Sequence, residues 1–146
     1  MADGFDRIKA MYETSYREHG DSPVSLLTPK GRQKQRFRVV EPFVKGRKAS
    51  VLDYGCGLGY LYAYLLHEGH DVRFTGLDIV PSFVEACRAK FPAASFEVID
   101  PQKPVSGRHD IVFASGVFNI RLDRDDRTSK DYAFAKIEEL FAAAGE

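Results

Sequence analysis

Cysteine is scarce in this chain, which has two among its 146 residues, Cys56 and Cys87. Two cysteines cannot build the disulfide framework of a small secreted domain, so we expect both to be reduced thiols in a cytoplasmic protein. Long apolar runs are also missing, because no segment approaches the roughly 18 apolar residues that a membrane helix needs. The N-terminal stretch from Met1 to Ala10 carries charges without an apolar core, so no secretory signal is predicted. Membrane association is therefore not expected.

Net charge is absent as well, since 21 basic side chains balance 21 acidic ones. A neutral chain is atypical of a dedicated nucleic-acid-binding protein, so nucleic acid is not an expected partner. One local bias remains, because eight of the nine charged residues from Lys30 to Lys48 are basic. This stretch is either a solvated helix face or a source of cations for an anionic ligand. The chain also lacks Cys and His at metal-ligand spacing and the G-x-S-x-G motif of a serine hydrolase, so no metal site is predicted.

Apolar residues at helical spacing predict a first helix at about residues 4–18. A second helix is expected at about 30–41, where Pro42 would kink or end it. From residue 49 onward, strands and helices alternate. Strands are predicted at 49–53, 72–77, 95–99 and 110–114, and helices at 58–68, 81–92 and 129–144. This alternation predicts an α/β fold with a doubly wound, mostly parallel sheet of about four strands, preceded by N-terminal helices.

The most informative segment runs from Val51 to Leu61. A short apolar strand ends in Asp53, three glycines follow at alternate positions, and a helical pattern resumes at once. Such a turn leaves the backbone bare enough for a ligand to lie against it. Asp78 closes the next predicted strand, 19 residues after Gly59, where a carboxylate can accept both hydroxyls of a ribose. Together these features predict a pocket for a cofactor of the adenosine type.

The spacing of the glycines narrows the choice of cofactor. Dinucleotide-binding proteins use G-x-G-x-x-G, in which helix-start amides meet a pyrophosphate. Here the pattern is Asp53-x-Gly55-x-Gly57-x-Gly59, without a basic residue in the turn. An acidic residue beside the loop would repel a pyrophosphate but could bind an ammonium group. S-adenosylmethionine has an amine and a sulfonium and no phosphate, so it fits better than a nicotinamide dinucleotide.

These residues resemble the first motif of the class I S-adenosylmethionine-dependent methyltransferases. The resemblance extends through three later motifs, at residues 76–79, 96–100 and 110–115, and covers about residues 36–120. It is strongest for bacterial small-molecule enzymes, and it implies a Rossmann-like sheet. It also implies roles for ten residues in cofactor binding: Arg36, Asp53, Gly55, Cys56, Gly57, Asp78, Ile79, Asp100, Pro101 and Ser115.

In the roles that the resemblance implies, Asp53 holds the cofactor amine and Arg36 its carboxylate, while the glycine loop faces the methionine part and the ribose. Ile79 would lie against the adenine face. Asp100 would accept from the adenine amino group, although an Asp-Pro pair also starts turns. Ser115 and Asn119 would line the methyl-transfer side. The catalytic candidates are Asn119 and His19, the latter because the N-terminal segment covers the active site in similar enzymes.

The family normally has seven strands, in the spatial order 3-2-1-4-5-7-6, whereas four are predicted here. We therefore expect a helical cap segment at residues 1–45 and a Rossmann-like domain at 46–146 that is C-terminally incomplete. The fourth strand would then be an exposed sheet edge, which is a known route to pairing with another chain. We therefore expect a homodimer through this edge, or poor solubility, unless the edge is covered.

The expected reaction is methyl transfer to an oxygen or nitrogen of a small-molecule acceptor. The segment after the fourth strand lacks the Asn/Asp-Pro-Pro-Tyr/Phe signature of enzymes that methylate nucleobase or amide nitrogens. Two alternatives stay open: a fragment that binds the cofactor without turnover, and an RNA methyltransferase that uses the basic stretch from Lys30 to Lys48. A nicotinamide-linked oxidoreductase is disfavoured by the glycine spacing.

Overall fold

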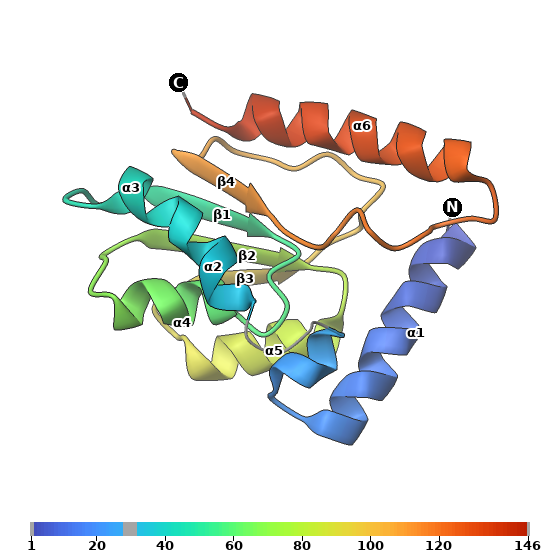
Figure 1. Ribbon diagram of the computed structural model, residues 1–146, viewed down its shortest axis with the longest axis horizontal. Helices are drawn as coiled ribbons and strands as arrows, with labels where there is room; N and C mark the ends of the chain where they lie inside the picture. Colours follow the sequence, from blue (N-terminus) through green and yellow to red (C-terminus); the bar gives the residue numbers. More distant parts are fainter. Residues whose placement is uncertain (1, 28–31, 146) are drawn as a thin grey trace.

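The computed structural model describes residues 2–27 and 32–145. Its centre is a parallel sheet of four strands in the order β3-β2-β1-β4 (Figure 1). The strands are β1 (Ser50–Tyr54), β2 (Arg73–Asp78), β3 (Ser95–Val98) and β4 (Ile111–Ala114). The α/β prediction is therefore confirmed, and each observed strand lies within one or two residues of its predicted range.

Helices cover both faces of this sheet (Figure 1). Two of them connect the first three strands, α4 (Tyr60–His67) and α5 (Pro81–Lys90), and α6 (Asp126–Ala143) follows β4. Successive side chains of a strand point to opposite faces, so Val51 packs in the core on the α4 side and Leu52 in the core shared with Leu140 of α6. The two central strands, β1 and β2, are thus largely buried on both faces, as strands of parallel sheets normally are.

The N-terminal part is helical, as predicted, but it is more broken than the sequence pattern indicated. The long helix α1 (Ala2–His19) is followed by a 3₁₀ turn, η1 (Pro23–Leu26). The second predicted helix consists of three short pieces, α2 (Gln33–Phe37), η2 (Arg38–Val40) and α3 (Glu41–Val44), and its expected start at Lys30 lies outside the described residues. Pro42 does not end the helix, because it occupies the first turn of α3, where its missing N–H removes no helical hydrogen bond.

The last helix begins three residues earlier than predicted. Asp125 caps it by accepting a hydrogen bond from the backbone amide of Arg127 at 3.0 Å. After the helix, His109 and Ala144 form an isolated parallel bridge beside the start of β4. Within the described sheet β4 otherwise pairs only with β1, so it is an edge strand. In the described residues, no helix combines the length and apolar composition required to cross a bilayer.

Candidate functional site

The glycine loop joins the end of β1 to the start of α4. The backbone amides of Gly55 and Cys56 both donate to the carbonyl of Leu77 in β2, at 2.7 and 3.0 Å. All three glycines of the loop have φ between +54° and +80°, a region that residues with a side chain rarely adopt. The loop shape therefore depends on glycine and on anchoring to the neighbouring strand.

Side chains from other parts of the protein cover part of the glycine loop. A Cβ atom at Gly55 would lie 2.1 Å from Val117 Cγ1, and one at Gly57 would lie 2.8 Å from Leu26 Cδ2. The side chains of Leu26 and Val117 thus pack against the loop, and sequence patterning gave no signal for either contact. Gly55, Cys56 and Gly57 nevertheless line a cavity, so the loop is both packed and accessible from one side.

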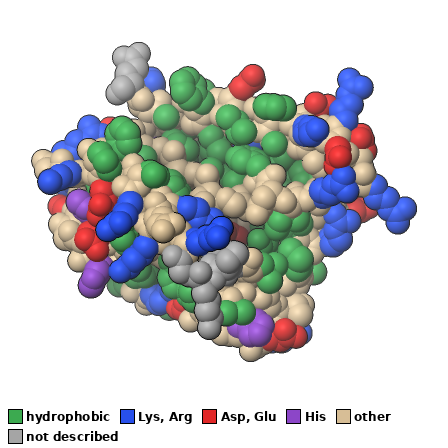
Figure 2. Space-filling view, in the orientation of Figure 1, with side chains coloured by type: hydrophobic (Ala, Val, Ile, Leu, Met, Phe, Trp, Pro, Cys, Tyr) green, Lys and Arg blue, Asp and Glu red, His purple; other side chains and the backbone are tan. Residues whose placement is uncertain are grey.

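This cavity has a volume of about 620 Å³ and lies at the carboxyl ends of the strands. Such crevices are where open α/β sheets bind ligands, and the volume is in the normal range for small-molecule sites. Among the described residues, its walls include side chains of α1, Leu26, Leu27 and α2, the strand ends with the glycine loop and the start of α4, the segment 115–122, and single residues of α5 and α6. In the space-filling view, hydrophobic side chains gather on the face between α6 and α1 (Figure 2).

Two buried carboxylates face the cavity side by side. Asp53 is 4% exposed and Asp78 is 8% exposed, and among the described residues neither forms an ion pair with a basic side chain. Burial, with a contribution from the charge of Asp78, raises the pKa of Asp53 to about 8. Burial also raises the pKa of Asp78 to about 6, although backbone amides that donate to it act in the opposite direction. A buried acidic pair of this kind favours a cationic ligand.

Asp78 also has a structural role. Its carboxylate accepts from the amide of Gly57 at 2.8 Å and from the amide of Val80 at 3.0 Å. The second contact fixes the turn between β2 and α5, and the first holds the glycine loop against β2. An ionised carboxylate has about four acceptor positions, so these two bonds leave capacity for ligand hydroxyls.

Arg36 of α2 reaches the other end of the site. Its Nη1 donates to the Oγ of Ser115, just after β4, at 3.3 Å, and both residues line the cavity. Ile79, Pro101 and Asn119 also line it. The structure therefore brings together nine of the ten predicted cofactor residues at one cavity: Arg36, Asp53, Gly55, Cys56, Gly57, Asp78, Ile79, Pro101 and Ser115.

Asp100 and His19 are placed elsewhere. Asp100 is exposed, does not line this cavity, and accepts from the amide of Gln102 at 3.0 Å, which is the turn geometry that an Asp-Pro pair favours. His19 lies at the C-terminal end of α1, with its Nε2 3.8 Å from a carboxylate oxygen of Glu18. The face of α1 toward the cavity is formed instead by Phe5, Ile8, Met11 and Tyr12.

The two cysteines are free and buried, Cys56 within the glycine loop and Cys87 on α5. Their sulfur atoms point toward the carbonyl of Gly57, at 3.7 Å for Cys56 and 3.4 Å for Cys87. The neighbouring Cys87 thiol and burial raise the pKa of Cys56 well above its ordinary value. Among the described residues neither cysteine forms a disulfide, which agrees with the reduced thiols expected from the sequence.

Comparisons with known proteins identify the family of this chain. Residues 51–140 match a family described as a methyltransferase domain. A Mycobacterium tuberculosis protein named as a methyltransferase is 32% identical over 95 residues, which cover 65% of this chain and 57% of that protein.

Solved structures show the same fold. The plantazolicin methyltransferase, in complex with a triazolic desmethyl-plantazolicin analogue and S-adenosylhomocysteine, superposes with a TM-score of 0.61 at 19% identity, covering 97% of this chain and 55% of that one. An S-adenosylmethionine-bound amino pentose methyltransferase from Micromonospora echinaspora has a TM-score of 0.59 at 19% identity, covering 92% of this chain and 51% of that one.

The chain therefore belongs to the class I S-adenosylmethionine-dependent methyltransferase family, as its motifs indicated. It spans between half and three fifths of the length of the three relatives compared.

Proposed function

We propose that this chain binds S-adenosylmethionine across the carboxyl ends of its strands and transfers the methyl group to an oxygen or nitrogen of a small-molecule acceptor. The observation that carries the proposal is the pair of buried carboxylates, Asp53 and Asp78, beside a glycine loop at a cavity of about 620 Å³. Bound there, the cofactor supplies an electrophilic methyl group on a sulfonium.

In this proposal, the parts of the cofactor follow the order of the strands along the cavity. Asp53 at the end of β1 would bind the amine, and Arg36 with Ser115 beside β4 would bind the carboxylate. Asp78 at the end of β2 would accept the ribose hydroxyls. The nucleobase would then reach the β3 side, where Ile79, Ile99 and Pro101 form an apolar wall. This donor set suits a zwitterionic amino acid joined to a nucleoside.

The rest of the cavity supports a small acceptor with an apolar body. Apolar side chains of α1 and of the segment after β4 form its walls, among them Ile8, Met11, Phe118 and Leu122. The protein would align the acceptor with the methyl group and exclude water, which is most of what an in-line displacement at a sulfonium requires. Asn119, which lines the cavity, is the candidate to orient the attacking atom. The plantazolicin and amino pentose methyltransferases are likewise named for small acceptors.

Isothermal titration with S-adenosylhomocysteine tests the binding step. The wild-type chain should bind, Gly57→Val should abolish binding, and Asp53→Asn should weaken it because the amine loses its counterion. Asp71→Asn is the matched control, since Asp71 is exposed and pairs only with Lys48 in the described chain, at 3.4 Å. No measurable binding of S-adenosylhomocysteine by the wild-type chain, or tighter binding of a nicotinamide dinucleotide, would contradict the proposal.

Turnover separates an enzyme from a module that only binds the cofactor. With S-adenosylmethionine and a panel of small amines, alcohols and carboxylic acids, an enzyme produces S-adenosylhomocysteine and a methylated acceptor detectable by mass spectrometry. Heat of cofactor binding without any methylated product would favour a module that only binds the cofactor.

A second copy of this chain is the proposed partner at the β4 edge. Figure 1 shows α6 running alongside β4, and the outer face of α6 exposes Phe134 and Phe141, at 66% and 82%. Lys130 and Glu138 are exposed four residues before and after Phe134. Two α6 helices packed antiparallel about Phe134 would therefore place each Lys130 opposite the Glu138 of the other copy, which supports self-association over an unrelated partner.

A further inference from the structure

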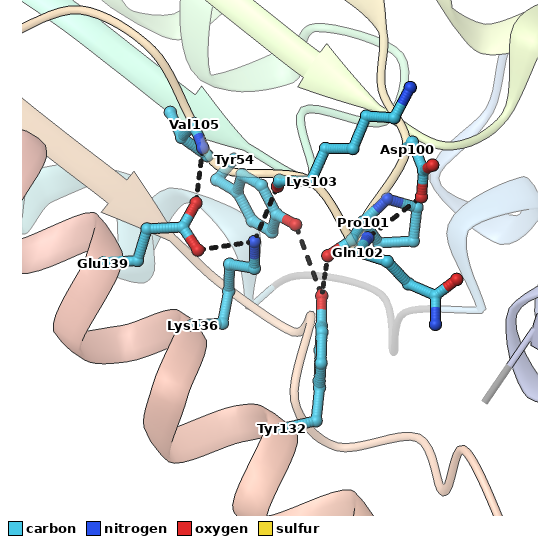
Figure 3. Close-up of polar contacts among 9 residues, drawn as sticks. All are labelled: Tyr54, Asp100, Pro101, Gln102, Lys103, Val105, Tyr132, Lys136 and Glu139. Carbon is cyan, nitrogen blue, oxygen red and sulfur yellow. Dashed lines mark hydrogen bonds and ion pairs between the residues drawn. The ribbon is translucent and has the colours of Figure 1, made fainter.

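Helix α6 holds the loop that follows β3 at three points along one of its faces. The hydroxyl of Tyr132 donates to the carbonyl of Pro101 at 3.1 Å. One helical turn later, Lys136 Nζ donates to the carbonyl of Lys103 at 3.0 Å. The carboxylate of Glu139 accepts from the backbone amide of Val105. Figure 3 shows these three side chains projecting from the helix toward the loop.

The contacts are partly buried and connected to one another, so they hold the loop in place. Lys136 is 4% exposed, and its ammonium group lies 2.8 Å from a carboxylate oxygen of Glu139. It also lies over the rings of Tyr54 and Tyr132, at 5.9 and 6.0 Å from their centroids. A buried lysine is costly unless it is paired and hydrogen-bonded. Glu139 pairs with Lys136 within α6, and the contacts of Lys136 with the carbonyl of Lys103 and the ring of Tyr54 tie α6 to the loop and to β1.

The fastened loop forms one end of the cavity. Ile99 and Pro101 line it, and so do Tyr54 and Tyr132, whose hydroxyls are 3.4 Å apart. The loop itself turns at Asp100, whose carbonyl accepts from the amide of Lys103 at 3.0 Å. Because β3 lies beyond β2 in the sheet, this end is the one that the nucleobase of the cofactor would reach.

We infer that Tyr132 is a positioning residue that fixes, through the carbonyl of Pro101, the wall against which the nucleobase of the cofactor lies, and that α6 thereby sets the selectivity for adenine. This inference rests on the proposed function. Tyr132 acts on the wall and not on the reacting atoms, so its effect is on ligand affinity and nucleobase choice rather than on methyl transfer.

The test is Tyr132→Phe, which removes the hydroxyl and keeps the ring and its packing against Phe5, whose ring centroid is 5.1 Å away. Dissociation constants are measured by calorimetry for S-adenosylhomocysteine and for S-inosylhomocysteine, in which an oxo group replaces the 6-amino group and N1 becomes a donor instead of an acceptor. We expect affinity for the adenosyl ligand to fall roughly 3- to 10-fold, the range for one lost hydrogen bond, and affinity for the inosyl ligand to change much less.

Tyr64→Phe is the matched control. Tyr64 also donates one hydrogen bond, to Glu41 at 3.0 Å, but it does not line the cavity, so neither dissociation constant should change. Glu139→Gln is the second variant and decides the matter if Tyr132→Phe does not fold. It keeps an acceptor for Val105 but removes the counterion of Lys136, and we expect the same selective loss with a smaller amplitude.

Equal affinity losses for both ligands, or no loss for either, would overturn the inference. The proposed function would fail separately, because then the wild-type chain would not bind S-adenosylhomocysteine at all. Wild-type binding with an unaltered preference in Tyr132→Phe and in Glu139→Gln would leave the site in place and remove only the positioning role.

Discussion

The carboxylate of Asp78 accepts a hydrogen bond from the backbone amide of Gly57, across 21 positions of sequence. This bond links the end of β2 to the middle of the glycine loop, so the residue proposed to bind the ribose also supports the loop that faces the rest of the cofactor. A substitution at Asp78 should therefore affect both the stability of the protein and the binding of the ligand.

Asp78→Ala should lower the free energy of unfolding by about 1–3 kcal/mol, because two buried amides, of Gly57 and Val80, lose their acceptor. Urea denaturation followed by circular dichroism measures this change. Asp71→Ala is the control, and a surface carboxylate of this kind should change the stability by no more than about 0.5 kcal/mol. Equal effects of the two variants would contradict the supporting role of Asp78.

Stability should fall as the pH rises from about 4 to about 8. Asp53 and Asp78 have pKa values of about 8 and about 6 in the folded protein, both above the ordinary value of 3.8. In this window the folded state binds more protons than the unfolded state, so raising the pH favours unfolding, by up to about 1.4 kcal/mol per pH unit for each carboxyl. Denaturation at several pH values should show the slope, and Asp53→Asn should reduce it, particularly between pH 6 and 8. A wild-type profile as flat as that of the variant would refute this prediction.

Binding of the cofactor should release a proton near pH 7. Asp53 is largely protonated there in the free protein, and the ammonium group of the ligand stabilises the ionised form and lowers its pKa. Titrations of S-adenosylhomocysteine in two buffers with different ionisation enthalpies measure the number of protons released. Asp53→Asn should bind without this release, whereas buffer-independent heats for the wild type would show that Asp53 is already ionised.

Self-association should depend on the outer face of α6. Sedimentation equilibrium should show a dimer that Phe134→Glu dissociates, while Phe43→Glu, at a Phe that is 62% exposed on α3, should have no effect. Lys130→Glu should weaken the dimer, and adding Glu138→Lys should restore it. A monomeric wild-type chain at high concentration would remove the second copy as the partner.

Much of the fold could be predicted because its signals are local. The strands were predictable from short apolar runs, and the start of α5 from Pro81, whose fixed φ suits the first turn of a helix. The broken helix around Pro42 was not predictable in detail, because a proline can either end a helix or begin the next one. Which of these occurs depends on the packing of Val40 and Val44 in the core rather than on local sequence.

The cavity residues also fall into two groups, those predictable from a local motif and those brought to the site by tertiary packing. Asp53, the glycines and Asp78 belong to a short motif with fixed spacing and were predicted from it. Leu26, Val117 and Tyr132 reach the site through tertiary packing, and no periodicity within their own segments indicates a role. Asp100 was assigned to the cofactor by resemblance to the family, but it does not line the cavity. Its observed geometry is the turn that an Asp-Pro pair favours locally.

The glycine loop owes its shape to β2 as much as to its own sequence. The amides of Gly55 and Cys56 share the carbonyl of Leu77, and the amide of Gly57 uses Asp78, so three consecutive donors are already satisfied by a strand that comes later in the chain. The loop therefore cannot reach its native conformation during folding until β1 and β2 have paired. Once formed, it meets the ligand in its final conformation, and little ordering entropy remains to be lost when the cofactor arrives.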